Sequence, residues 1–304
     1  MRRGGRISLR ARLTRLAFRA FMKRSESDLS IADIRRRFRT MERLVPPPPR
    51  GTTTRSVDAG GVDGDFITTR ASRSDRHLLY LHGGAYAFGS PRLYRHFTWR
   101  MANAARAHVL IIDYRLAPEH PFPAGLEDAV KAWRWLLDCG ATPAGMAIAG
   151  DSAGGGMSLA LMLKLRDEGL PLPAAAVAMS PWTDLALTAP SLGRNADADP
   201  MLVAGDIPRF AAGYLGGADP RHPYASPLYS DPRGLPPTLI QAGGDEVLLD
   251  DAVRMAEAMR AAGCAVELQV WPKMPHTWQL LAPVLPEARA ALDEIARFLD
   301  RQLA

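Results

Sequence analysis

Cysteine is scarce in this chain, whose 304 residues include only Cys139 and Cys264. The two lie far apart and match no metal-ligand spacing, so the sequence predicts neither a disulfide framework nor a cysteine-bound metal. Two free, partly buried thiols are typical of a reducing compartment, and we expect a cytoplasmic protein. No cluster of His, Cys and Asp predicts another metal site, and we expect no metal or organic cofactor.

Long hydrophobic runs are also missing. No stretch approaches the roughly 18 uninterrupted apolar residues of a membrane span. Arginines interrupt the N-terminus at short intervals and leave no apolar run of the length that a secretory signal peptide needs. With 47% hydrophobic and 23% charged residues, the composition is that of a globular protein with a sizeable core.

Acidic residues are absent from residues 1–24, which carry nine arginines and lysines. The rest of the chain has 29 basic and 32 acidic residues, so the formal net charge of +6 comes from this segment. A nucleic-acid-binding protein carries positive charge on a folded face as well. The charge distribution therefore argues against nucleic acid as a partner.

Apolar residues within this basic segment recur at helical spacing, namely Leu9, Leu13, Leu16, Ala17 and Phe21. They predict an amphipathic helix. In one interpretation, this helix packs over the body of the protein and its arginines face solvent. In the other interpretation, residues 1–24 make a weak peripheral contact with an anionic membrane surface.

Beyond the proline run Pro46–Pro49, short apolar strands alternate with helical stretches, a pattern that predicts an α/β fold with a mostly parallel sheet. The expected strands include His77–Leu81, Val109–Asp113, Met146–Ala149, Ala175–Met179, Thr238–Gln241 and Ala265–Val270. The expected helices include Leu126–Asp138, Gly155–Glu168, Asp250–Ala262 and Pro286–Gln302. We expect residues 46–182 and 237–304 to form the core, and residues 1–45 and the irregular insertion 183–236 to form a cap.

The strongest chemical signal is the motif Gly150-Asp-Ser152-Ala-Gly154. It fits G-x-S-x-G, follows a predicted strand and opens a predicted helix, which is the context of a nucleophile elbow. The glycines permit the sharp turn that exposes the hydroxyl. We therefore expect Ser152 to be a nucleophile.

A second motif, His82-Gly83-Gly84-Ala85, follows the strand that ends at Leu81. It corresponds to the HGGG-type loop of lipases and esterases, with alanine in place of the third glycine. We expect the N–H groups of Gly83, Gly84, Ala85 and Ala153 to form an oxyanion hole. His82 is expected to brace the loop.

The base and the acid follow from the chain order nucleophile, acid, histidine. His276 comes after the last predicted strand and is the expected general base, whereas His222 precedes the acid and would break the order. Asp245 follows the strand Thr238–Gln241 and is the expected acid. Glu246 and Asp250 remain alternatives.

These motifs together resemble the bacterial hormone-sensitive-lipase family of esterases in its GDSAG subgroup. The resemblance also covers Tyr114–Pro123, between the oxyanion loop and the elbow, and Ser180–Asp184. It implies an α/β-hydrolase fold with a helical cap over the site. It further implies hydrolysis of small carboxylic esters with short to medium acyl chains through an acyl-enzyme.

Substrate and assembly are less constrained by the sequence. An amidase, thioesterase or acetyl-hydrolase of the same fold is the main alternative, and a non-catalytic ligand receptor is another. Monomer and homodimer both remain open. The expected pocket walls, each of which also suits a plain core position, are Tyr86, Phe88, Trp182, Met201, Tyr214 and Trp278.

Overall fold

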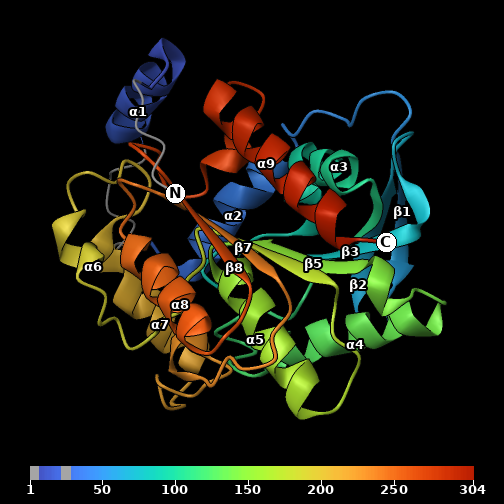
Figure 1. The fold of residues 1–304 in the computed structure, drawn as a ribbon. Helices are drawn as coiled ribbons and strands as arrows, with labels where there is room; N and C mark the ends of the chain where they lie inside the picture. The colour runs from blue at the N-terminus through green and yellow to red at the C-terminus, as the bar shows by residue number, and fades with distance from the viewer. Residues whose placement is uncertain (1–6, 22–28) are drawn as a thin grey trace.

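An eight-stranded sheet forms the centre of the computed structural model, which describes residues 7–21 and 29–304 (Figure 1). The strand order is β1-β2-β4-β3-β5-β6-β7-β8, with β1–β2 and β2–β4 antiparallel and every other pair parallel. The strands are β1 (Thr53–Asp58), β2 (Asp63–Thr68), β3 (Arg73–Leu81), β4 (Ala107–Ile112), β5 (Met146–Asp151), β6 (Ala175–Met179), β7 (Thr238–Gly243) and β8 (Val266–Trp271).

Helices cover both faces of this sheet. The longer ones are α1 (Leu9–Phe21), α2 (Ile31–Glu42), α3 (Pro91–Ala105), α4 (Ala124–Asp138), α5 (Ala153–Asp167), α7 (Ile207–Leu215), α8 (Leu249–Ala261) and α9 (Pro286–Gln302). Helices α3 and α9 pack on one face, and α4, α5 and α8 on the other. A hydrophobic core lies on each face of the sheet, and the side chains of β3 point alternately into one and the other. Leu78 and Tyr80 face α3, whereas Leu79 and Leu81 face α5.

The expected α/β architecture is confirmed, and each of the six expected strands and four expected helices has its counterpart. The structure adds β1, β2 and α3, which the sequence analysis did not anticipate. Helix α2 begins at a capping box, in which the Ser30 hydroxyl accepts the Asp33 N–H while the Asp33 carboxylate accepts the Ser30 N–H. Cys139 and Cys264 are both free, and Cys139 is exposed rather than partly buried.

The insertion between β6 and β7 carries short elements around α7. These are α6 (Ser191–Arg194) and the 3₁₀ turns η2 (Ala204–Asp206) and η3 (Pro227–Tyr229), whereas η1 (Pro143–Gly145) and η4 (Trp278–Leu281) lie outside the insertion. Arg209 of α7 donates to the Leu29 carbonyl at 2.9 Å, and Arg19 of α1 donates to the Asp197 carbonyl at 3.1 Å. The N-terminal helices and the insertion are therefore in direct contact.

Candidate active site

Ser152 lies at a sharp turn between β5 and α5. Its φ of +55° is a left-handed value that non-glycine residues rarely adopt. The turn is fixed from both sides, since the Ser152 N–H donates to the Met179 carbonyl at 2.8 Å and its carbonyl accepts the Trp182 N–H at 3.0 Å. This is the strand–turn–helix context that the motif predicts.

The glycines on either side of Ser152 make this turn possible. A Cβ at Gly154 would collide with the Leu81 and His82 carbonyls at the end of β3, and one at Gly150 would collide with the Gly154 carbonyl. The motif thus needs glycine because backbone approaches backbone.

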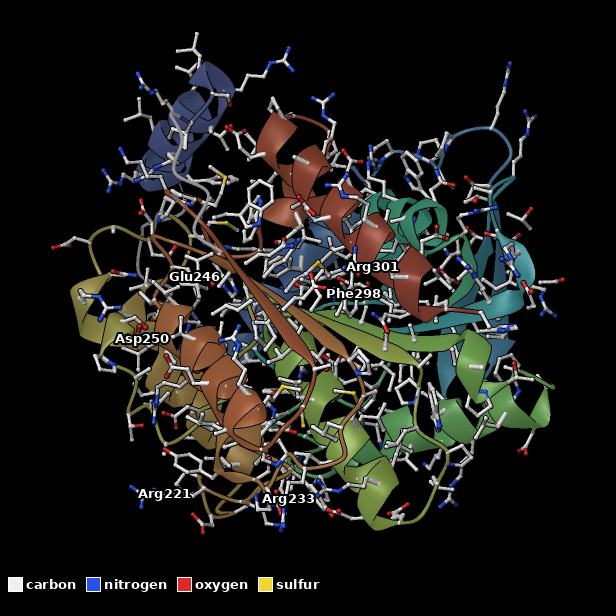
Figure 2. All side chains as sticks on the ribbon, viewed as in Figure 1. Arg221, Arg233, Glu246, Asp250, Phe298 and Arg301 are labelled. Atoms are coloured by element: carbon white, nitrogen blue, oxygen red, sulfur yellow. The ribbon has the colours of Figure 1, made fainter. Side chains whose placement is uncertain are left out.

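His276 brings Ser152 and a buried carboxylate into one hydrogen-bonded series. Its Nε2 is 2.9 Å from the Ser152 hydroxyl, and its Nδ1 is 3.0 Å from Oε2 of Glu246. Oε1 of Glu246 accepts the Gly243 N–H at 3.0 Å, which fixes the carboxylate. Glu246 is fully buried, near one end of the sheet in Figure 2. The arrangement is that of a nucleophile, a general base and an orienting acid.

The carboxylate that contacts His276 is Glu246, so the structure departs from the expectation for Asp245. Neighbouring residues in the turn after β7 point in opposite directions. Asp245 forms an ion pair with Arg15 of α1 instead. Asp250, the other alternative, accepts the Ser191 N–H at 2.9 Å and pairs with Arg194.

Two further buried polar groups, to which the sequence analysis assigned no role, hold the acid and base loops. The Asp199 carboxylate accepts the Val247 N–H at 3.0 Å, beside Glu246. The Ser180 hydroxyl accepts the Thr277 N–H at 3.1 Å, beside His276. Asp199 comes from the irregular insertion, where no motif marks it, whereas Ser180 belongs to the Ser180–Asp184 motif.

The charge around His276 sets its proton affinity. Burial lowers the pKa of the imidazole, but the hydrogen bond and negative charge of Glu246, with Asp199 and Asp151 farther away, outweigh burial and raise it above its ordinary value. A protonated His276 cannot accept the Ser152 proton. Activation of Ser152 by His276 would therefore require a pH above this raised pKa.

We expect kcat/KM to fall with decreasing pH, with a midpoint above about 6.5, the ordinary histidine value. Glu246→Gln should move that midpoint to lower pH, because burial then acts on the imidazole without the compensating carboxylate. The pH–rate profiles of the two proteins check this. A midpoint that moves upward in the variant would contradict the assignment.

The oxyanion loop, His82–Ala85, follows β3, and the buried Asp151 carboxylate holds it in place. The Gly83 N–H donates to the Tyr94 hydroxyl at 3.0 Å and to the Asp151 carboxylate at 3.1 Å. This N–H is thus occupied, contrary to its expected place in the oxyanion hole. Within residues 7–21 and 29–304, no acceptor engages the N–H groups of Gly84, Ala85 or Ala153.

Two further features concern this loop. Ala85 adopts φ +52°, so the residue that replaces the third glycine accepts a left-handed conformation that costs about 1–2 kcal/mol. His82 stacks on Tyr114 with ring centroids 4.3 Å apart, and its Nδ1 lies 2.7 Å from the Gly83 carbonyl oxygen. Burial lowers the pKa of His82 to about 4. A neutral His82 that braces the loop agrees with the expectation.

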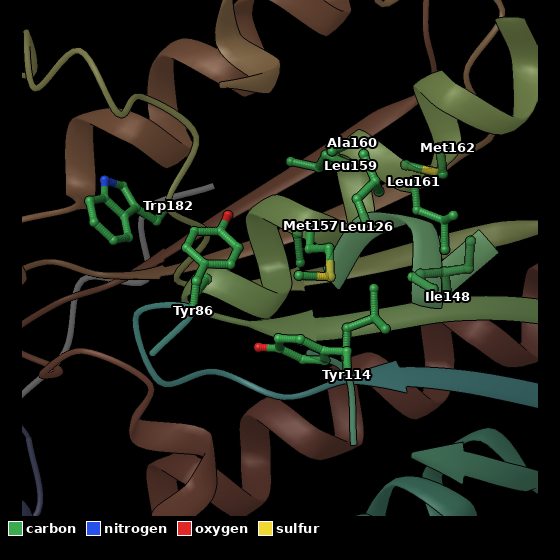
Figure 3. Packing of buried hydrophobic residues seen from close by; sticks show 14 of the residues in the cluster. Tyr86, Tyr114, Leu126, Ile148, Met157, Leu159, Ala160, Leu161, Met162 and Trp182 are labelled. Atoms are coloured by element: carbon green, nitrogen blue, oxygen red, sulfur yellow. The ribbon is translucent and has the colours of Figure 1, made fainter. Parts of the chain in front are cut away.

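Aromatic side chains gather beside the elbow and the oxyanion loop. Tyr86 stacks on Tyr214 of α7 with centroids 3.7 Å apart and lies next to Trp182, as Figure 3 shows for Tyr86 and Trp182. Phe88 stacks on Phe38 of α2 at 4.5 Å. Met201, half-buried, lies in the insertion, and its N–H donates to Asp199.

Trp278 differs from the other expected pocket residues. It is fully buried in the core cluster that lies between the sheet and helices α3 and α9, 5.8 Å from Trp271 between ring centroids. Tyr86, Trp182 and Tyr214 belong to the cluster on the opposite face. The structure therefore places Trp278 on the other face of the sheet from these three expected pocket walls.

In the part of the chain that the structure describes, no three His, Cys, Asp or Glu side chains are grouped so that they could hold a metal ion. Within the same residues, no helix is long and apolar enough to cross a membrane.

Comparison with known proteins agrees with this geometry. The family described as "alpha/beta hydrolase fold" matches residues 78–280. An acetyl-hydrolase of Streptomyces hygroscopicus is 50% identical over 249 residues, which cover 79% of this chain and 83% of that protein. A crystal structure of an esterase from the bacterial hormone-sensitive lipase family has a TM-score of 0.91 at 43% identity and covers 99% of this chain and 100% of that one.

A second solved structure, EstE5 soaked with p-nitrophenyl butyrate, has a TM-score of 0.92 at 39% identity and covers 97% of this chain and 99% of that one. Fold, motif order and relatives agree. The chain belongs to the α/β-hydrolase fold family, within its bacterial hormone-sensitive-lipase group, and is a carboxylic ester hydrolase.

Proposed function

We propose that this enzyme hydrolyses small carboxylic esters with short to medium acyl chains through a Ser152–His276–Glu246 triad and an acyl-enzyme. The observation that carries the proposal is the hydrogen-bonded series from the Ser152 hydroxyl through His276 to the buried Glu246 carboxylate. No other serine is at once on a strained elbow and in contact with a histidine among the residues that the structure describes.

Acylation begins when the Ser152 hydroxyl attacks the ester carbonyl carbon while Nε2 of His276 takes its proton. The Glu246 carboxylate holds the imidazole in the required tautomer and stabilises the imidazolium. The N–H groups of Gly84, Ala85 and Ala153 donate to the oxyanion, and the N-terminus of α5 adds its positive dipole. The tetrahedral intermediate then collapses, and His276 gives the proton to the leaving alcohol oxygen.

Deacylation repeats these steps with water. His276 takes a proton from the water, whose oxygen attacks the acyl carbon, and then returns the proton to the Ser152 oxygen as the acid leaves. Each proton that His276 accepts is handed on within the same half-reaction. The cycle therefore needs no metal, redox partner or organic cofactor.

The substrate pocket is proposed to lie against Tyr86, Phe88, Trp182 and Tyr214, beneath a cap made by residues 1–45, of which the structure describes 7–21 and 29–45, and by residues 183–236. Support for this cap comes from the contacts of Arg209 with Leu29 and of Phe38 with Phe88. A cytoplasmic location, as monomer or homodimer, belongs to the same proposal. The free state of Cys139 and Cys264 supports a reducing compartment.

Removal of acetyl groups is a second candidate, favoured by the Streptomyces acetyl-hydrolase relative. The experiment that separates the candidates measures kcat/KM on p-nitrophenyl esters from acetate to palmitate, and on the thioester and amide of the preferred acyl group. We expect the ester to be the best of the three and the optimum to lie at short or medium chains. A sharp preference for acetate favours an acetyl-hydrolase, and faster amide or thioester cleavage contradicts the proposal.

A further inference from the structure

Helix α1 presents a row of exposed leucines to solvent. Leu9, Leu13 and Leu16 are 70%, 57% and 62% exposed. Their spacing of four and three residues places them along one side of the helix. The helix projects from the body at the top left of Figures 1 and 2. The amphipathic helix expected from the sequence is therefore present, but its leucines face away from the protein.

The opposite side of α1 is fixed to the body by polar contacts. Arg15 pairs with Asp245 and donates to the Lys273 carbonyl at 2.7 Å. At the start of the helix, the Ser8 N–H and hydroxyl donate to the Glu287 carboxylate at 2.7 and 3.0 Å, and Ala11 is buried beneath them. These contacts set the rotation of the helix, so the leucine row is held outward.

Positive charge borders the leucine row on both sides. At 3.6 residues per turn, Arg10 lies on one side of the row and Arg12 and Arg19 on the other, and all three are exposed. Residues 1–24 contain no acidic residue. A second copy of the chain would bring like charges together if it docked on this row. A layer of anionic headgroups over an apolar interior matches both the arginines and the leucines.

We propose that the outer face of α1, made by Leu9, Leu13 and Leu16 with Arg10 and Arg12, docks on an anionic lipid surface. The leucines enter the boundary between headgroups and acyl chains, and the guanidinium groups bind lipid phosphates. Arg15 joins this helix to the turns that carry Glu246 and His276. Docking therefore brings the esterase site proposed above close to the lipid surface.

The test measures flotation of the full chain with vesicles of phosphatidylcholine, with and without phosphatidylglycerol, and with no p-nitrophenyl ester added. We expect binding that requires phosphatidylglycerol and weakens with added salt. Leu13→Gln/Leu16→Gln should reduce the partition coefficient at least about tenfold, because two apolar side chains no longer enter the lipid. Arg10→Gln/Arg12→Gln should reduce it as well.

The matched control is Met41→Gln/Leu44→Gln, which changes two side chains that are 50% and 78% exposed outside α1. This control should bind as the wild type does, and circular dichroism verifies that each variant is folded. Equal binding by the Leu13→Gln/Leu16→Gln variant, or no binding by the wild type, overturns the proposal. A dimer that this variant alone dissociates, without vesicle binding, would assign the row to contact between copies instead. Failure of the esterase assays leaves this vesicle result unaffected.

Discussion

Replacing Ser152 with alanine is expected to lower kcat for p-nitrophenyl butyrate about 10⁶-fold. The substitution removes the hydroxyl that lies against His276 and attacks the ester carbonyl carbon. Binding and the oxyanion N–H groups remain, so a residual rate above that of free water is expected. The measurement is steady-state kinetics on protein whose folding is verified by circular dichroism.

Ser158→Ala provides a control within the same helix. Ser158 is fully buried and donates to the Gly154 carbonyl at 2.7 Å, so its removal costs one internal hydrogen bond, about 1 kcal/mol of folding free energy, without touching the triad. Its kcat should stay within about tenfold of the wild type. Comparable activity of Ser152→Ala and wild type would show that another residue attacks the ester.

The second large effect concerns the acid. Glu246→Gln is expected to lower kcat about 10⁴-fold, because an amide neither holds the required His276 tautomer nor stabilises the imidazolium. Asp245→Asn should change kcat only a few-fold, since Asp245 pairs with Arg15 and makes no contact with His276 among the described residues. Side-by-side kinetics of these neighbouring, isosteric substitutions separate the two carboxylates. A large loss for Asp245→Asn with activity retained in Glu246→Gln would reverse the assignment.

The sequence predicts the parallel part of the sheet better than its antiparallel edge. Strands β3 to β8 lie in the parallel part of the sheet, and most of them carry continuous apolar runs that stand out along the chain. Strands β1 and β2 are antiparallel and lie at one edge, and β1 has no fully buried residue. Their polar sequences, TTRSVD and DGDFIT, contain no apolar run.

Helix α3 was missed for another reason. Its start signals are present, because Ser90 caps it and Pro91 occupies its first turn. The helix carries Arg92, Arg95 and Arg100 along with its apolar residues, and no known motif falls on it. Its buried side, which includes Phe97 and Met101, becomes clear only from its packing against the sheet and α9.

Within the site, motifs predicted the residues at the turns but not the direction of individual side chains. Ser152 and His276 follow from the elbow and the chain order, and the structure joins them. The choice between Asp245 and Glu246 depends on which neighbour in a turn points inward, and composition does not encode that direction. The hydrogen bond from the Gly83 N–H to the Asp151 carboxylate likewise depends on the folded path of the oxyanion loop.

The outward leucines of α1 show the same limit. Their spacing predicts a helix, yet spacing alone favours burial of the apolar side. The rotation of the helix about its axis is set by two contacts with carboxylates far away in the sequence. Arg15 pairs with Asp245, and Ser8 donates a hydrogen bond to Glu287. Contacts of this range cannot be derived from a local pattern.

The central claim is that His276 and Glu246 activate Ser152, and covalent labelling by diethyl p-nitrophenyl phosphate tests it most directly. Mass spectrometry should find one diethylphosphoryl group per chain, on the peptide that contains Ser152. The inactivation rate constant should fall strongly in Glu246→Gln and remain nearly unchanged in Asp245→Asn. A label on another residue, or a rate that falls in Asp245→Asn but not in Glu246→Gln, would contradict the account.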